Sequence, residues 1–174
     1  LQHKFPVICM HPDEVACKEL WMKAFGDDEQ FADSFIMRYY SRRRMLTAEA
    51  EGRMAAMLHL LPFRTELGRT TYIYGVATDP AFRGRGLAPQ LMREAMRLIA
   101  ERGDDAALLI PTPGKEWLRE FYGRFGFAGD VPARFVSADR FDFGTGDAAA
   151  DRAMVWRRDS SVPLPEQLTA SWHS

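Results

Sequence analysis

The chain has 174 residues, enough for one domain with a single core, and its composition of 47% hydrophobic and 27% charged residues is globular. Basic and acidic side chains nearly balance at 23 against 24, so the chain lacks the basic excess that a nucleic-acid partner would need. No apolar run approaches the roughly twenty residues of a membrane span, and the first ten residues do not resemble a signal peptide. We therefore expect a cytoplasmic protein with no membrane or nucleic-acid partner.

The cysteines and histidines do not predict a metal site. Cys9 and Cys17 are the only cysteines, and the four histidines are scattered along the chain. A metal site would need a second cluster of such residues, and a disulfide framework would need more cysteines. We expect two reduced thiols and no metal.

The N-terminal part of the chain predicts two helices. Apolar residues recur at helical spacing over 13–25, and Gly26 is expected to end that helix. Asp27 and Asp28 offer an N-cap for a second helix, which the basic run Ser41–Arg44 is expected to end. These arginines suit a helix C-terminus better than a nucleic-acid patch, because the total charge is nearly neutral.

The rest of the chain alternates between strands and helices. We expect strands at 45–50, 54–61, 70–78, 106–110, 133–143 and 153–157, and helices at 88–102 and 115–124. Glu51-Gly52-Arg53 is a hairpin signal, and the tail 159–174 is expected to be irregular. The order predicts the α/β class, in its α+β form, with one mixed sheet flanked by helices and a single domain over 1–158.

The segment 74–88 carries the clearest functional signal. It predicts a strand, a short loop and the start of a helix, with Arg83, Gly84, Arg85 and Gly86 alternating in the loop. Backbone N–H groups converge in such a loop, and the N-terminus of the helix favours an anion. The glycines allow a close approach and the arginines raise the positive potential, so a diphosphate is the natural ligand.

Two other phosphate-binding motifs do not fit this segment. A nucleotide P-loop would continue with Lys-Ser/Thr, but Leu87 and Ala88 follow here. A dinucleotide-binding fingerprint would place three glycines near the first strand of the fold. A purely structural loop stays open as an alternative, although two glycines and two arginines at a helix start favour a ligand.

The same segment resembles motif A of the GNAT superfamily of acyl-CoA-dependent N-acetyltransferases. Arg83, Gly86 and Ala88 fill its pattern Gln/Arg-x-x-Gly-x-Gly/Ala. Residues 121–127 resemble the family's Tyr-x-x-x-Gly-Phe segment, with Tyr122 in the Tyr position. The resemblance extends over about residues 15–157, and the string that starts at Tyr122 is also similar to the enhanced-intracellular-survival acetyltransferases.

The resemblance implies a fold and an acetyl-CoA site. The fold would be a mostly antiparallel central sheet with flanking helices and two strands splayed to admit acyl-CoA. Strand backbone would bind the pantetheine arm, and the loop with its helix start would bind the pyrophosphate. The residues so assigned are Val76, Ala77, Thr78, Arg83, Gly84, Arg85, Gly86, Leu87 and Ala88.

The resemblance also assigns Tyr122 as the general acid that protonates the leaving thiolate. A tyrosine with a pKa near 10 is well matched to a thiol whose pKa is about 8.5–10. The alternative is that Tyr122 is one of several aromatic residues on the core face of its helix.

The general base is open, because Tyr72 and Tyr74 lie on the strand where many family members carry a Glu. The candidates are His59, Glu66, the terminal carboxylate of Ser174 and a water chain. Lys115 stands where the family often has an Asn that contacts pantetheine, so the chain departs from the family's pattern at this position.

The function predicted in this way is an N-acetyltransferase that transfers acetyl from acetyl-CoA to a primary amine of a small molecule or peptide. The alternative is a non-catalytic acyl-CoA-binding sensor or interaction module on the same fold. A homodimer is possible, and the sequence does not identify the acceptor.

Overall fold

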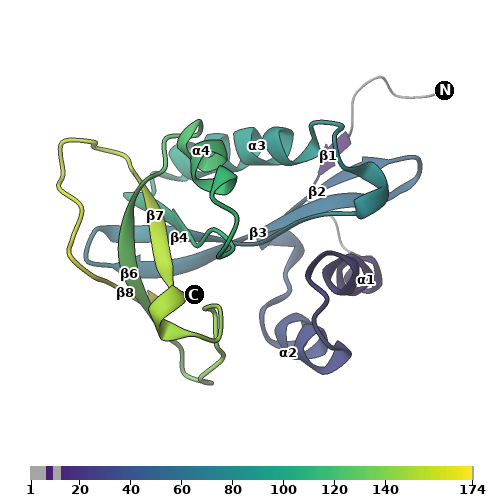
Figure 1. Cartoon of the computed structure of the whole chain (residues 1–174), viewed down its shortest axis with the longest axis horizontal. Coiled ribbons are helices and arrows are strands. Elements are labelled where there is room, and N and C mark those ends of the chain that lie inside the picture. Colours follow the sequence, from purple (N-terminus) through teal and green to yellow (C-terminus); the bar gives the residue numbers. More distant parts are fainter. Residues whose placement is uncertain (1–6, 10–12, 174) are drawn as a thin grey trace. The chain divides into compact units, whose positions relative to one another are not determined.

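A computed structural model describes residues 7–9 and 13–173 (Figure 1). The helices are α1 (Glu14–Phe25), α2 (Glu29–Tyr39), α3 (Leu87–Arg102) and α4 (Trp117–Gly123), with short 3-10 turns η1 (Arg42–Arg44), η2 (Pro80–Phe82) and η3 (Ala148–Ala150). The strands are β1 (Val7–Cys9), β2 (Met45–Ala50), β3 (Arg53–Thr65), β4 (Gly68–Thr78), β5 (Ala106–Leu109), β6 (Ala128–Val136), β7 (Arg152–Arg157) and β8 (Leu168–Trp172).

The chain divides into two compact units. Unit 1 comprises residues 1–60 and 74–95, and unit 2 comprises residues 61–73 and 96–174. Strands β3 and β4 and helix α3 each contribute residues to both units.

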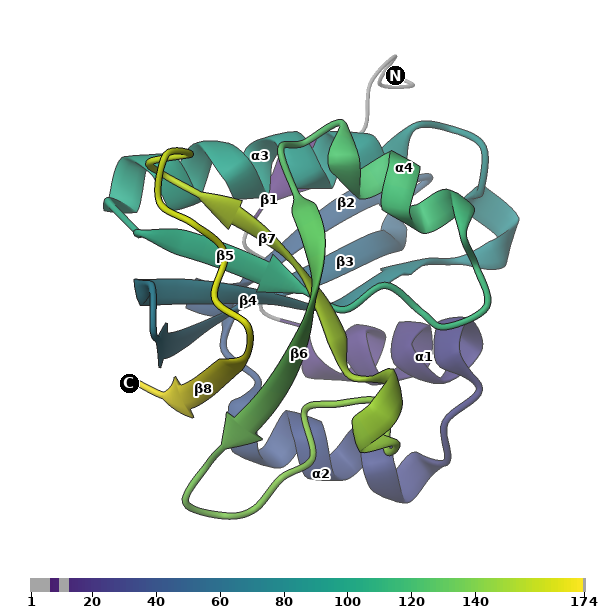
Figure 2. The same cartoon turned by 60° about the vertical axis from the view of Figure 1, so that its left-hand side comes forward.

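Unit 1 contains helices α1 and α2, which pack beside each other, and the strand order β1-β2-β3-β4 (Figures 1 and 2). Both helices begin at an aspartate, since Asp13 and Asp28 each accept a hydrogen bond from a first-turn N–H group. Gly26 ends α1 in the left-handed conformation, with φ of 66°. Both predicted helices are confirmed.

The β2–β3 hairpin of unit 1 confirms the predicted turn. Its antiparallel register ends at the pair Ala50–Arg53, which leaves Glu51 and Gly52 as the connecting residues. Both have positive φ, 53° and 75°, as a type I′ turn requires.

The basic run after α2 differs in part from the prediction. Helix α2 ends at Tyr39, and Arg42–Arg44 form a separate 3-10 turn capped by the Ser41 hydroxyl. The Arg44 guanidinium nevertheless donates to the Tyr39 carbonyl at 3.1 Å, so one arginine does satisfy the end of the helix.

Unit 2 contains the strand order β3-β4-β5-β7-β6-β8, and β8 pairs again with β3. Pairs β4–β5 and β6–β8 are parallel, whereas β5–β7, β6–β7 and β3–β8 are antiparallel. The predicted mixed, mostly antiparallel sheet is therefore confirmed. Aromatic residues fill its interior, and the Tyr72 hydroxyl donates to the carbonyl of Phe143 at 2.8 Å.

The C-terminal tail corrects a prediction. Residues 168–172 form β8, in which Leu168, Ala170 and Trp172 alternate with two polar residues, a short strand pattern that the expectation of an irregular tail overlooked. Long-range partners hold the strand: Phe135 of β6 and Phe63 of β3 pair with it, and the Glu66 carboxylate accepts the Thr169 N–H at 2.8 Å. The expectation of an irregular tail was wrong over this stretch.

The bounds of β6 also differ from the prediction of 133–143. The strand occupies 128–136, and the chain after it is held by local turns instead. Asp139 accepts bonds from the Ser137 hydroxyl and the Phe141 N–H, and Asp142 accepts the Gly144 N–H. Short acidic side chains that bond neighbouring backbone compete with strand pairing and end it.

Candidate active site

The glycine loop of unit 1 forms an open cradle at the start of α3. Gly84 and Gly86 have φ of 78° and 75°, and a Cβ at either position would meet no atom within 4 Å. Helix α3 begins at Leu87, and its first N–H groups have no partner inside the helix. The loop therefore offers free space beside unpaired donors at the positive end of a helix of 16 residues.

The arginines of this loop differ in their roles. The Arg85 guanidinium lies 3.3 Å from the Glu51 carboxylate and 4.8 Å from the centre of the buried Phe82 ring. The Arg53 guanidinium also lies 4.8 Å from the centre of this ring, so the Phe82 ring makes cation–π contacts with two arginines. Arg83 is exposed and forms no ion pair among the residues that the structure describes.

Asp79 fixes the path of the chain into the loop. Its N–H donates to the Ala55 carbonyl at 2.8 Å, and its buried carboxylate accepts the Ala81 N–H at 2.9 Å. Lys23 lies 3.5 Å from the other carboxylate oxygen. The hydrogen bond from Ala81, with help from Lys23, lowers the pKa of Asp79, so the cap stays charged at neutral pH.

Strand β4 extends past its pairing with β5. In the described ranges, β4 and β5 pair in parallel only from Thr70 to Tyr72; β5 ends at Leu109, while β4 continues to Thr78. Gly75 lies inside β4 with φ of 63°, and a Cβ there would lie 2.8 Å from the Trp21 ring. The backbone of Val76–Thr78 therefore lies beyond the segment that pairs with β5.

Tyr122 lies in α4, in unit 2, and only 8% of its surface is exposed. Its ring packs edge-on against Phe121 and Phe127 at 5.1 and 6.5 Å. Its hydroxyl forms no hydrogen bond with any described residue. Burial raises the pKa of Tyr122 to about 12, which corrects the value near 10 expected from the sequence.

Two of the candidates for the general base, Glu66 and His59, lie among the described residues, and neither is well suited to that role. The Glu66 carboxylate is occupied by the Thr169 N–H, and Ser174 lies outside the described residues. His59 is completely buried in unit 1, where its ring lies against the stacked rings of Trp21 and Phe35. Desolvation lowers the pKa of His59 to about 3, so this histidine is a very weak base.

Cys17 lies beside this histidine. Its Sγ atom is 3.9 Å from the His59 Nε2 atom and 3.6 Å from the Met57 Sδ atom. The thiol is free and buried, and burial raises its pKa to about 12. The reduced state expected for Cys17 is confirmed; the side chain of Cys9 lies outside the described residues.

Burial of His59 predicts a specific loss of stability in acid. Since its pKa is about 3 when folded and near 6.5 when unfolded, the unfolded chain binds more protons between these values. The free energy of unfolding should therefore fall as the pH drops from 6.5 towards 3, by up to about 1.4 kcal/mol per pH unit for this site. In His59→Leu the fall should be shallower, as measured by urea unfolding across this range; an equal slope would contradict the assignment.

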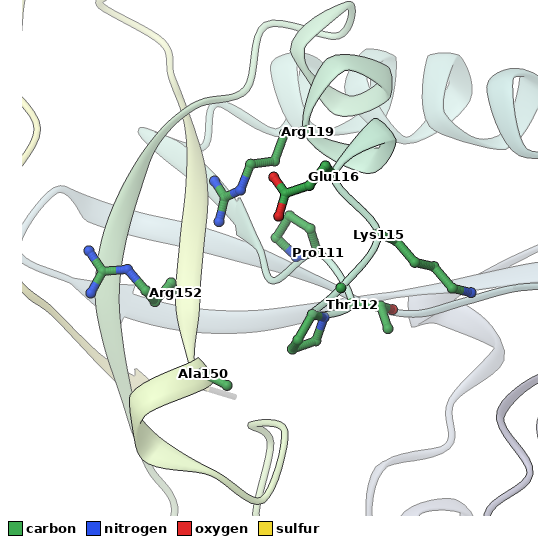
Figure 3. Close-up of a pocket in the computed structure, with 9 residues that line it drawn as sticks. Pro111, Thr112, Lys115, Glu116, Arg119, Ala150 and Arg152 are labelled. Carbon is green, nitrogen blue, oxygen red and sulfur yellow. The ribbon is translucent and has the colours of Figure 1, made fainter.

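Unit 2 holds a cavity of about 210 Å³ next to the end of β5 (Figure 3). Its lining residues are Pro111, Thr112, Pro113, Gly114, Lys115, Glu116, Arg119, Ala150 and Arg152. Figure 3 shows Arg119 and Glu116 extending from the start of α4 and Arg152 from β7, while Lys115 extends the opposite way. The sequence did not indicate Arg119 and Arg152 as partners, because they are 33 positions apart with β6 between them.

The sequence of this chain matches a known protein family. The model of the acetyltransferase (GNAT) domain matches residues 11–129. The chain belongs to the GNAT acetyltransferase family. No curated protein matches the chain.

Solved GNAT structures share the fold at low sequence identity. YhbS from Escherichia coli, in complex with CoA, is 18% identical with a TM-score of 0.67, over 97% of this chain and 90% of that one. A GNAT acetyltransferase from Brucella melitensis, in complex with acetyl-CoA, is 16% identical with a TM-score of 0.66, over 99% and 98% of the chains. An N-acetyltransferase from Anabaena variabilis is 17% identical with a TM-score of 0.63, over 72% of this chain and 32% of that one.

The predicted site residues of this GNAT domain are distributed over both units. All nine residues assigned to acyl-CoA, from Val76 to Ala88, lie in unit 1, and Tyr122 lies in unit 2. Over the described ranges, no helix is long and apolar enough to cross a membrane. Nor do the described side chains include a group of three or more His, Cys, Asp or Glu residues placed to hold a metal ion.

Proposed function

We propose that the protein is an N-acetyltransferase that moves an acetyl group from acetyl-CoA to a primary amine of a small molecule or peptide. The observation that carries the proposal is the open cradle of Gly84 and Gly86 at the start of α3 in a GNAT chain. Two of the structural neighbours hold CoA or acetyl-CoA, which supports the same ligand class here.

The chain's own groups fit this ligand. The N–H groups of the loop and of Leu87 and Ala88 would bind the pyrophosphate oxygens, and Pro89, which has no N–H, stands just beyond them. Arg83 and Arg85 would add positive charge. The backbone edge of Val76–Thr78 that does not pair with β5 would bind the amide groups of the pantetheine arm.

Tyr122 would act as the general acid. With a pKa of about 12 its hydroxyl stays protonated throughout the neutral range, although it is then a weaker acid than the thiol and less closely matched to it than an ordinary tyrosine. The amine attacks the thioester carbonyl carbon, the carbon–sulfur bond breaks, and the Tyr122 hydroxyl would donate to the sulfur that leaves as a thiolate. Donation is strongest at that moment, since negative charge develops on sulfur only as the bond breaks.

A second candidate function is a non-catalytic acyl-CoA sensor. The two base candidates among the described residues favour it, because His59 is a very weak base and the Glu66 carboxylate accepts the Thr169 N–H. If the protein is instead an acetyltransferase, water would carry the proton of the acceptor amine to solvent. Turnover separates the two functions, since a sensor would bind acetyl-CoA and leave it intact.

Acetyl-CoA should stabilise the protein and be consumed only with an amine present. At a hundredfold excess over Kd the expected stabilisation is about 2.7 kcal/mol, read as a rise in Tm. Release of the CoA thiol should then depend on amines supplied from a panel of amino acids, polyamines and peptides. A rise in Tm without thiol release for any amine would support the sensor, and no rise in Tm would contradict both functions.

A further inference from the structure

Two prolines restrict the backbone on one side of the cavity in unit 2. Pro111 and Pro113 fix two backbone φ angles, and Gly114 turns the chain with φ of 85° before α4 begins. Arg119 and Arg152 line the same cavity from α4 and β7. A rigid wall loses little entropy when a ligand binds, so a small ligand can be held by few contacts.

Asp130 holds both arginines of this wall. One oxygen of its carboxylate accepts the Arg119 Nη2 group at 3.1 Å and the Arg152 Nε group at 2.8 Å. Backbone carbonyls complete the anchoring, since Gly129 accepts from Arg119 and Asp130 accepts from Arg152. Each guanidinium therefore keeps a fixed orientation.

The arrangement leaves a surplus of hydrogen-bond donors. Two guanidinium groups share a single carboxylate, and each retains N–H groups that Asp130 and Gly129 do not use. The side chains are 35% and 43% exposed, so these donors are reachable from solvent. Paired, pre-oriented guanidinium groups match the planar geometry of a carboxylate.

The position of Arg119 relates the cavity to the proposed acid. Arg119 and Tyr122 are three residues apart in α4, so they lie on neighbouring positions of one helix face. The rise between them along the helix is about 4.5 Å. A ligand group on Arg119 is therefore held by the same rigid helix that carries the Tyr122 hydroxyl.

We propose that Arg119 and Arg152 bind a carboxylate of the acceptor, so that the acceptor is an amine that also carries a carboxylate, such as an amino acid. This inference rests on the proposed acetyltransferase function and names the class of its substrate. Glu116 lines the same cavity without a partner among the described residues, and its charge opposes the ligand carboxylate. This opposition gives the proposal a test in which two substitutions in one cavity act in opposite directions.

The direct test uses a matched pair of product mimics, N-acetylglycine and N-acetylglycinamide, with the full chain saturated with CoA. They differ only in carboxylate against amide. N-acetylglycine should shift the side-chain Nε–H NMR signals of Arg119 and Arg152, and N-acetylglycinamide should not. Equal shifts with both compounds, or none with either, would overturn the carboxylate site, whether or not an acceptor that turns over has been found.

Kinetics provides the second test, with each amino acid compared to its amide. Arg152→Gln and Arg119→Gln should each lower kcat/KM for the acid by roughly tenfold to a hundredfold, the usual effect of losing a bond to a charged group, and change the amide little. Glu116→Gln should raise kcat/KM for the acid. Arg134→Gln is the control, because Arg134 is an exposed arginine of β6 outside the cavity.

The results separate this inference from the function on which it rests. If acetyl-CoA does not raise Tm, the acyl-CoA site itself is wrong. If acetyl-CoA binds and amines are acetylated, but acids and amides react equally well, only the carboxylate site is wrong. Arg152→Lys guards against a folding effect, since it keeps the charge and should recover part of the loss that Arg152→Gln causes.

Discussion

Tyr122→Phe is expected to lower kcat by roughly 10²–10⁴-fold, the usual contribution of general-acid catalysis, while KM for acetyl-CoA changes little. The substitution removes one hydroxyl and keeps the ring, whose contacts with Phe121 and Phe127 should survive. The loss should fall on kcat because the hydroxyl acts only when charge develops on the leaving sulfur. Steady-state kinetics with an identified amine measures both constants.

The pH profile sharpens this test. Since the pKa of Tyr122 is about 12, its ionisation should not reduce the rate of the native enzyme below about pH 11. A decline centred near pH 10 that Tyr122→Phe abolishes would show that the hydroxyl titrates as an exposed tyrosine does. An unchanged kcat would show that Tyr122 is a structural aromatic residue of the core and not the general acid. A large drop in Tm would instead show that the hydroxyl has a structural partner, although the described residues provide none.

Gly86→Val should abolish the stabilisation by acetyl-CoA. The Cβ and its methyl groups would occupy the open space at the start of α3, where the pyrophosphate is proposed to bind. The expected change is the loss of the whole rise in Tm, which corresponds to about 2.7 kcal/mol at a hundredfold excess of ligand over Kd. Thermal unfolding with and without acetyl-CoA measures it.

Gly103→Val is the matched control for this substitution. Gly103 follows the other end of α3 with φ of 77°, and a Cβ there would also meet no atom within 4 Å. Both variants therefore introduce the same left-handed strain of about 1–2 kcal/mol. Gly103→Val should keep its full response to acetyl-CoA, and a normal response from Gly86→Val would show that the phosphate loop is misplaced.

Local sequence signals predicted most of the elements, because those elements carry their own patterns. Asp28 and Gly26 mark helix ends through capping, and Glu51-Gly52 marks a hairpin through its φ angles. The apolar run 106–110 identifies β5, which is buried throughout. In each case the residue that specifies the structure lies inside or next to it.

The features that were missed depend on distant partners. Strand β8 alternates apolar and polar residues over only five positions, too short a run to stand out in a tail with two prolines, and it forms where β3 and β6 both offer an edge to it. The pairing of Arg119 with Arg152 depends on Asp130, which the fold brings between them from β6. The acidity of Tyr122 likewise depends on burial, which the residue type alone does not determine.

Closure of unit 2 by β8 has a consequence for the order in which the domain assembles. Thr169 and Glu66 are 103 residues apart, so their contact forms only after a large loop has closed, and such contacts form slowly. Until then β3 and β6 would each present a row of unpaired N–H and C=O groups, the kind of edge that recruits strands from other chains. Partly folded molecules are therefore most prone to aggregate in the interval before β8 pairs with β3 and β6. Once β8 has paired, neither edge is exposed.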